Sequence, residues 1–174
     1  MSTDKQLIVL LGPTASGKTA LAVEIACTLD GEIISADSRQ IYRRLDIGTG
    51  KDLKEYGFIP YHLIDSHDIG EAFSVAHFQK AAFDAINDVF ARGKQPILCG
   101  GTGLYIESLL ANYQFSHVPH FLSEPLDIQF KYTVFGLNPS TETRRDKISV
   151  RFQARLKEGM LEEVQQLLYE GVHP

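Results

Sequence analysis

The stretch Gly12-Pro13-Thr14-Ala15-Ser16-Gly17-Lys18-Thr19 decides the fold of this chain. It has the pattern G-x-x-x-x-G-K-T and stands between an apolar run at 7–11 and a helix-like run at 20–26. A strand, this loop and a helix are together the context that a phosphate-binding P-loop requires. Successive backbone N–H groups of such a loop surround phosphate oxygens, and the helix dipole adds to the attraction. We therefore predict that this loop binds a phosphate or diphosphate group.

Two side chains of the loop have separate roles in that prediction. Lys18 is expected to reach the outer phosphates as a point charge, and the Thr19 hydroxyl is expected to bind Mg²⁺. The alternative is a glycine-rich turn with an incidental lysine. The apolar run before the loop and the amphipathic run after it disfavour that alternative.

Length and composition are those of an ordinary globular domain. The 174 residues, 44% of them hydrophobic and 22% charged, fit a single domain over 1–174. Cys27 and Cys99 have no metal-ligand or redox spacing, and the sequence shows no secretory segment or long apolar span. We therefore expect a reducing, cytoplasmic setting and no membrane association. The net charge of −5 argues against a uniformly basic nucleic-acid binder, although a basic patch lies between 144 and 157.

Apolar runs alternate with helical patterns along the chain. Strand-like runs lie at about 6–11, 32–36, 60–64, 96–100 and 131–137. This alternation predicts an α/β, P-loop NTPase-like three-layer fold with a mostly parallel sheet and helices on both faces. The clearest helix follows Ser74, a candidate N-cap, and ends at Gly93; another helical pattern at 142–170 is expected to be divided by Gly159. Residues 111–130 have no regular period and form an unusually long connection.

Residues that follow the strands are the first candidates for chemistry, because the carboxyl ends of parallel strands converge on a ligand. Asp37, after the second strand, suits a general base or a Mg²⁺ ligand; alternatively, it caps a following helix. The fourth strand is followed by 100–103, Gly-Gly-Thr-Gly, whose glycines allow a substrate to approach the backbone. No aspartate ends that strand, which departs from the pattern of GTPases and ATPases.

The histidines show no catalytic or metal-binding spacing. His62 and Asp65, near the third strand-like run, are expected to be polar edge residues rather than a catalytic pair. His62, His67 and His77 lack the ligand spacing of a zinc site, so we assign them structural roles.

Taken together, these segments resemble the tRNA dimethylallyltransferases, also called tRNA isopentenyltransferases. The P-loop is shared by many enzymes, but Ala-Asp-Ser-Arg-Gln at 36–40 followed by Gly-Gly-Thr-Gly-Leu-Tyr at 100–105 is far more specific. The resemblance covers about residues 6–112 and 131–171. Its matching stretches are the P-loop, 34–43, 45–51, 61–65, 73–78, 100–106 and 151–164.

The resemblance implies an activity and its partners. Such enzymes transfer a dimethylallyl group from dimethylallyl diphosphate to the N6 amine of an adenine beside the tRNA anticodon, with Mg²⁺ at the diphosphate. By the resemblance, Asp37 accepts the amine proton, Thr102 hydrogen-bonds near that amine, and Arg151 binds the diphosphate. The segment Asp37-Ser38-Arg39-Gln40 is implied to contact the target nucleotide together with Thr102, and the P-loop to hold the diphosphate.

The chain also departs from the family pattern. Family members carry a helical tRNA-binding insertion where 111–130 stands here, and they continue beyond the final glycine. We therefore expect either a piece of a longer protein or a naturally reduced relative, monomeric and with weaker tRNA binding. Three alternatives stay open: an adenylate isopentenyltransferase acting on free nucleotide, a small-molecule P-loop kinase, and a non-catalytic phosphate-binding module.

Overall fold

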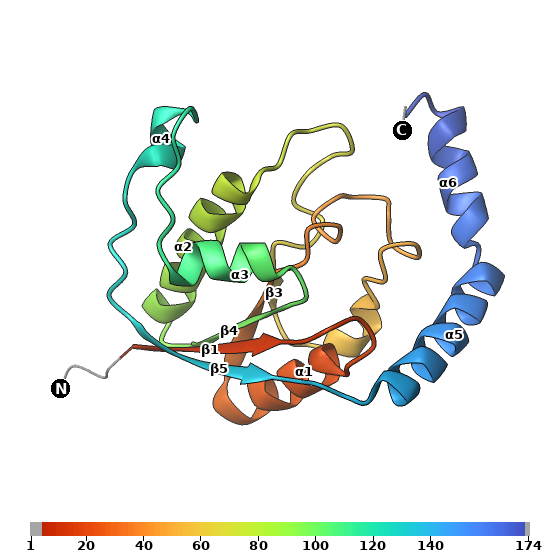
Figure 1. Cartoon of the computed structure of the whole chain (residues 1–174), viewed down its shortest axis with the longest axis horizontal. Helices are drawn as coiled ribbons and strands as arrows, with labels where there is room; N and C mark the ends of the chain where they lie inside the picture. Colours follow the sequence, from red (N-terminus) through yellow and green to blue (C-terminus); the bar gives the residue numbers. More distant parts are fainter. Residues whose placement is uncertain (1–4, 173–174) are drawn as a thin grey trace.

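The computed structural model describes residues 5–172 as a three-layer α/β fold built on one parallel sheet (Figure 1). The strand order is β3-β2-β4-β1-β5, and every pair of neighbours is parallel. The five predicted strands are confirmed, although the third is only two residues long. They are β1 (Gln6–Leu11), β2 (Gly31–Ser35), β3 (Tyr61–His62), β4 (Gln95–Gly100) and β5 (Lys131–Gly136). The ends of the predicted domain, 1–4 and 173–174, lie outside the described residues.

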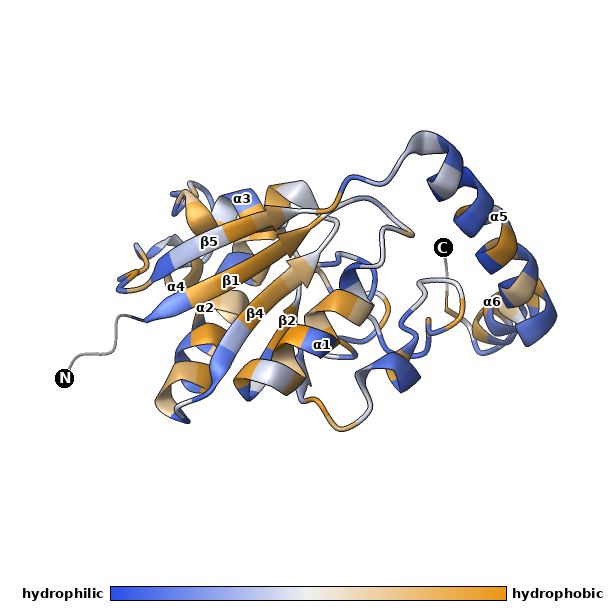
Figure 2. Ribbon diagram, turned by 90° about the horizontal axis from the view of Figure 1, so that it is seen from below, coloured by the Kyte–Doolittle hydropathy of each residue, from blue (hydrophilic) through white to orange (hydrophobic). Residues whose placement is uncertain are grey.

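Helices cover both faces of the sheet, as predicted (Figures 1 and 2). One face packs against α1 (Lys18–Leu29) and the short 3₁₀ helix η1 (Leu53–Tyr56), and the other against α2 (Val75–Ala91) and α3 (Gly103–Leu110). Because side chains alternate along a strand, β1 sends Ile8 and Leu10 into the α1 side and Leu7 and Val9 into the α2 side. The inner strands β2 and β4 are buried almost throughout, which explains their mostly apolar sequences, whereas the edge strand β5 is exposed and more polar in Figure 2.

The ends of α2 follow from its sequence. The Ser74 hydroxyl accepts a hydrogen bond from the His77 backbone N–H at 3.4 Å, and His77 Nδ1 accepts one from the Ser74 N–H at 3.2 Å. This is a capping box in which histidine takes the usual place of glutamate. Gly93 adopts a left-handed φ of 73° just beyond the helix. The predicted N-cap and the predicted stop are both confirmed.

The helices α5 (Thr141–Glu158) and α6 (Met160–Tyr169) lie beyond the carboxyl end of the sheet rather than on either face (Figure 1). Gly159 divides them as predicted, with a left-handed φ of 102°. No residue of α5 is buried, and Leu167 is the buried residue of α6. Apolar packing therefore contributes little to holding this helix pair against the rest of the molecule, and polar contacts contribute most.

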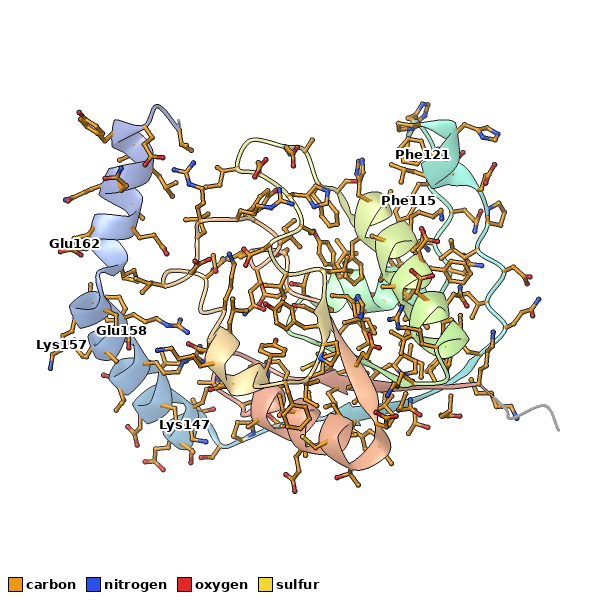
Figure 3. The ribbon with its side chains drawn as sticks, turned by 180° about the vertical axis from the view of Figure 1, so that it is seen from behind. Phe115, Phe121, Lys147, Lys157, Glu158 and Glu162 are labelled. Carbon is orange, nitrogen blue, oxygen red and sulfur yellow. The ribbon has the colours of Figure 1, made fainter. Side chains whose placement is uncertain are left out.

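The connection at 111–130 is irregular, except for the single turn α4 (His120–Ser123). Asn112 closes it: the side-chain amide donates to the Leu126 carbonyl at 3.0 Å and accepts from the Leu126 N–H at 3.4 Å. Figure 3 shows Phe115 and Phe121 in this connection, at the far end of the molecule from α5 and α6. Over residues 5–172, no helix combines the length and the apolar character needed to cross a bilayer.

Candidate active site

The P-loop joins β1 to α1 at the carboxyl end of the sheet. Ala15 and Gly17 adopt left-handed φ values of 62° and 87°, so the chain between them curls. The helix then begins at Lys18, and its first turn carries no acidic side chain that would neutralise its positive end. Curled backbone amides at a helix N-terminus are suited to bind an anion, so phosphate binding by this loop stays a prediction.

This loop forms one wall of a cavity of about 560 Å³, called here the P-loop cavity. The other walls come from the end of β2, the end of β4, the loop at 48–56 and α5. The cavity is lined by 14–20, Ser35, Asp37, Arg39, Gln40, 48–50, Asp52, Glu55, Tyr56, 99–101, Asp146, Lys147, Val150, Arg151 and Arg155. Gly12 and Pro13, the first two residues of the motif, line a neighbouring cavity of about 350 Å³ instead.

Lys18 is held across the P-loop. Its ammonium donates to the Pro13 carbonyl at 2.8 Å and to the Ser16 hydroxyl at 3.4 Å. Burial lowers the pKa of Lys18; the nearby Cys99 and Asp37 oppose this shift, and Arg151 adds to it. A phosphate in the cavity would provide the full negative charge that the present neutral acceptors do not.

Cys99 lines the same cavity, but its thiol is a poor candidate for a nucleophile. Burial raises the pKa of its thiol to about 11, and the neighbouring Lys18 offsets only part of that increase. The thiol is therefore protonated at neutral pH, and the thiolate is the reactive form. The candidate bases of this cavity are therefore its carboxylates, and Asp37 is the one that follows the end of β2.

Asp37 lies directly beyond β2 and faces the P-loop cavity. Its Oδ1 accepts a hydrogen bond from the Arg39 backbone N–H at 2.9 Å, which is the geometry of an Asx turn. No helix follows, because residues 38–41 form turns. The alternative in which Asp37 caps a helix is therefore wrong, and so is the expectation of a helical pattern between β2 and β3, where η1 alone forms.

Thr102 ties the end of β4 to the end of β2. Its hydroxyl accepts a hydrogen bond from the Ser38 backbone N–H at 3.1 Å, and its own N–H donates to the Ala36 carbonyl at 3.1 Å. A Cβ atom on Gly100 would overlap the backbone of Ala36. The close neighbour that requires this glycine is therefore the adjoining loop, whereas the sequence suggested a substrate.

The remaining predicted residues meet at the same end of the sheet. Gln40 lines the P-loop cavity and donates from its amide to the Gly50 carbonyl at 3.1 Å. Arg151 reaches the cavity from α5, and its guanidinium lies 3.4 Å from the Asp52 carboxylate. Arg39 lines the cavity too. Ser38 and Thr102, which are hydrogen-bonded to each other, do not line the cavity, although Asp37 and Gly101 next to them do.

The role of one loop beside the cavity could not be predicted from its residue types or their spacing. The loop at 46–52 contributes several cavity residues, and its Lys51 is 1% exposed. The Lys51 ammonium donates to the Tyr42 carbonyl and to Asp46 Oδ1, both at 2.6 Å, and also to Asp65. A single lysine has no periodicity, so only the matching stretch 45–51 could have drawn attention to it.

The histidines and Asp65 have structural partners. Asp65 accepts from buried Lys51, and His62 Nε2 lies 2.7 Å from the Glu32 carboxylate. His67 Nδ1 lies 2.9 Å from the Ser66 hydroxyl. Together with the helix cap at His77, these contacts support the structural roles predicted for them.

The protein side chains could hold Mg²⁺ only with help from a phosphate. Among residues 5–172, no group of three or more His, Cys, Asp or Glu side chains is arranged to bind a metal. Thr19 and Asp37 nevertheless line the same cavity as the P-loop amides. Since Mg²⁺ commonly combines one or two protein ligands with phosphate oxygens and water, this donor set fits a diphosphate-bound Mg²⁺.

Known proteins match the chain in sequence. Residues 40–127 match the family model described as IPP transferase, and residues 5–57 match the one described as isopentenyl transferase. The chain is 50% identical over 151 residues to tRNA dimethylallyltransferase 2 of Trichlorobacter lovleyi, which covers 83% of this chain and 50% of that protein. It is 39% identical over 216 residues to tRNA dimethylallyltransferase 1 of Geotalea uraniireducens, covering 95% of this chain and 72% of that protein. The chain thus spans half the length of the first relative.

Solved structures match the fold. The full-length tRNA isopentenylpyrophosphate transferase of Bacillus halodurans superposes with a TM-score of 0.87 at 28% identity, covering 97% of this chain and 72% of that one. The tRNA delta(2)-isopentenylpyrophosphate transferase of Staphylococcus epidermidis gives a TM-score of 0.82 at 33% identity, covering 97% and 75%. These matches agree with the parallel sheet and the P-loop described above. The chain belongs to the IPP transferase family.

Proposed function

We propose that this chain transfers a dimethylallyl group from dimethylallyl diphosphate to the N6 amine of an adenine beside the anticodon of a tRNA. One observation carries the proposal: Asp37 and the P-loop with Lys18 line the same cavity. A base for the accepting amine and a cradle for the departing diphosphate therefore face one another. The names of the relatives support both the tRNA and the dimethylallyl donor. Family membership also favours prenyl transfer over the phosphoryl transfer of a small-molecule kinase.

The proposed reaction is a single displacement. The adenine nitrogen forms a bond to C1 of the dimethylallyl group, while the bond from C1 to the diphosphate oxygen breaks and its electron pair leaves with the diphosphate. The amine proton passes to the Asp37 carboxylate. The P-loop amides, Lys18 and Arg151 stabilise the charge that develops on the leaving group. Bound Mg²⁺, held by Thr19, would neutralise part of the same charge.

The acceptor side of the site is proposed at the segment Asp37-Ser38-Arg39-Gln40. The target adenine must leave its stack before its amine can reach a base in a cavity. The hydrogen bond from the Ser38 N–H to Thr102 keeps this segment in place, and the Asx turn at Asp37 fixes its start. We propose that Thr102 supports the segment and lies near the amine.

We also propose that 1–174 is a catalytic core and that 111–130 stands where relatives carry a tRNA-binding insertion. The match to the Geotalea relative extends over 216 residues, more than the 174 of this chain, so that relative has residues without a counterpart here. Much of the affinity of proteins for nucleic acids comes from phosphate contacts. A core without the insertion should bind tRNA more weakly.

A labelled-donor assay tests the proposal. The chain is incubated with labelled dimethylallyl diphosphate, Mg²⁺ and either unmodified tRNA or AMP. Label in tRNA supports the proposed activity, label in AMP alone indicates the adenylate isopentenyltransferase instead, and label in neither contradicts both.

Two variants separate the roles of base and cradle. Asp37→Ala should lose transfer by at least about a hundredfold, since general base catalysis contributes roughly 10²–10⁴, and should still bind pyrophosphate. Lys18→Ala should weaken the binding of pyrophosphate itself. Asp84→Asn, on the exposed side of α2 and paired with Lys80, is the matched control and should change neither property. Transfer by Asp37→Ala at the wild-type rate would show that the base is another group.

A further inference from the structure

We infer that Glu163 is a positioning residue for the donor side of the P-loop cavity: it holds the loop at 46–52 against α6. Its carboxylate accepts hydrogen bonds from three successive backbone N–H groups. Oε1 accepts from Asp46 at 2.7 Å and from Ile47 at 2.8 Å, and Oε2 accepts from Gly48 at 3.0 Å. Three successive amides that converge on one carboxylate form an anion nest. The role of Glu163 in donor binding rests on the proposed function.

The contact with Glu163 fixes a loop that forms part of the cavity wall. Residues 48–50 and Asp52 line the cavity, whereas Glu163 does not. Inside the loop, the Gly50 N–H donates to the Ile47 carbonyl at 3.2 Å, so the amides bound by Glu163 belong to the same turn as the wall. Gly50 then accepts from Gln40, which places the acceptor-side segment against this turn. A shift of the turn would move both sides of the site.

The same loop also determines where the arginines of α5 lie. Asp52 accepts from Arg155 at 3.2 Å and lies 3.4 Å from Arg151, the residue proposed to bind the diphosphate. Arg155 is packed so closely against Gly50 that a Cβ atom there would overlap its guanidinium. Glu163 therefore acts on Arg151 through the loop and Asp52, without touching the ligand.

Few other contacts could take over this task. In α5 and α6, which lie wholly within the described residues, Leu167 alone is buried. Just beyond α6, Glu170 pairs with Arg44, and both side chains are exposed, where ion pairs contribute little. The charge-assisted bonds of Glu163 are the stronger class of interaction. Other bonds hold 50–52, but the contact of 46–48 with α6 should depend mainly on this one carboxylate.

The chemistry of the nest predicts which substitution fails. Glutamine has the same shape as glutamate, but its amide has only one accepting oxygen and presents N–H groups in place of the other. In Glu163→Gln at least one of the three N–H groups would face another donor. Aspartate keeps the charge on a shorter side chain and should retain part of the function. Glu162 is the matched control, because it precedes Glu163 on the same helix and lies on the outer side of α6 (Figure 3).

The test combines hydrogen exchange with the binding of inorganic pyrophosphate in the presence of Mg²⁺, on the full chain. In Glu163→Gln, the amides of 46–48 should exchange faster, and the dissociation constant for pyrophosphate should rise about tenfold, as expected for the loss of charge-assisted hydrogen bonds. Glu163→Asp should give an intermediate rise, and Glu162→Gln should match wild type in both measurements. Circular dichroism identifies any variant that fails to fold. If Glu163→Gln fails to fold, the difference in pyrophosphate binding between Glu163→Asp and Glu162→Gln decides whether Glu163 positions the donor site.

The outcomes distinguish this inference from the proposed function. Faster exchange at 46–48 with unchanged pyrophosphate binding would show that Glu163 holds the loop but does not position the donor site, and would overturn the inference. Unchanged exchange would overturn it as well. If wild-type protein failed to bind pyrophosphate, the donor site itself would be refuted, and the positioning role with it.

Discussion

The hydroxyl of Thr102 accepts a hydrogen bond from the backbone N–H of Ser38 at 3.1 Å, although 64 residues separate them in the chain. This bond joins the loops that leave β4 and β2, and so holds the segment that begins at Asp37. The carboxyl ends of neighbouring parallel strands converge in this way wherever helices return the chain to the other end of the sheet. The candidate base and its support are thus placed together by the topology.

Removing the Thr102 hydroxyl should therefore reduce prenyl transfer. Thr102→Val keeps the shape but leaves the Ser38 N–H without this acceptor, at a cost of roughly 1–3 kcal/mol. If that cost falls on the transition state, the rate should drop by about 5- to 160-fold. Thr102→Ser restores the hydroxyl and should recover most of the activity. The measurement is the initial rate of label incorporation into tRNA. Equal rates for Thr102→Val and Thr102→Ser would mean that the hydroxyl has no role.

Much of this fold could be predicted from local patterns. The P-loop, the five strands, the Ser74 cap and the break at Gly159 all have signals that lie within a few residues of one another. The convergence of Asp37 and Thr102 follows from the rule that parallel strands end at one edge.

The rest of the site could not be predicted, because its signals are not local. Lys51 is held by a carbonyl and by carboxylates from three places in the chain, and no spacing records that arrangement. The acceptor for the Gly48 N–H lies 115 residues further on, at Glu163. The segment between β2 and β3 was expected to be helical, but turns and these side-chain bonds shape it instead.

Gly100→Ala should destabilise the fold. The added Cβ would overlap the backbone of Ala36, which cannot move away easily because its N–H and carbonyl are both hydrogen-bonded to the β4 segment. We expect a loss of about 3 kcal/mol in the free energy of unfolding, the upper end of the usual cost of overpacking. Urea denaturation measures the loss. Gly103→Ala is the matched control, because no atom lies within 4 Å of a Cβ at that position; an equal loss in both variants would contradict the close approach at Gly100.

Lys51→Met should also destabilise the chain, for an electrostatic reason. Methionine keeps most of the volume, but Asp46, Asp65 and the Tyr42 carbonyl lose their common cation. Breaking a buried ion pair by removing one partner typically costs about 3–5 kcal/mol; because Asp46 and Asp65 are partly exposed, we expect about 3 kcal/mol. Lys54→Met, at an exposed lysine of η1, should stay within about 0.5 kcal/mol of wild type. The two urea midpoints give the comparison, and equal midpoints would exclude a stabilising role for Lys51.

Glu32 should make the stability of the chain depend on pH in the acid range. Hydrogen bonds from Arg92, at 2.7 and 3.1 Å, lower the pKa of this buried carboxyl below its usual value; burial opposes the shift and the His62 hydrogen bond adds to it. In the unfolded chain the Glu32 carboxyl has the usual pKa of about 4.3. Between that pH and the lower pKa of the folded state, the unfolded state therefore binds more protons. The stabilisation is therefore complete above about pH 4.3 and is lost as the pH falls through the folded pKa.

The variant Arg92→Ala tests this dependence. The difference in unfolding free energy between wild type and Arg92→Ala should be constant near neutral pH and should shrink as the pH is lowered through that interval. Lys94→Ala removes an exposed pair with Asp30 at the same end of the sheet and serves as the control, with a difference from wild type of roughly 0.2–1 kcal/mol. Urea unfolding at a series of pH values measures both differences. A bond that favours the ionised carboxylate must weaken when that carboxylate is protonated. If the difference for Arg92→Ala instead stays the same down to pH values well below the usual glutamate pKa, the Arg92 bond does not lower the pKa of Glu32.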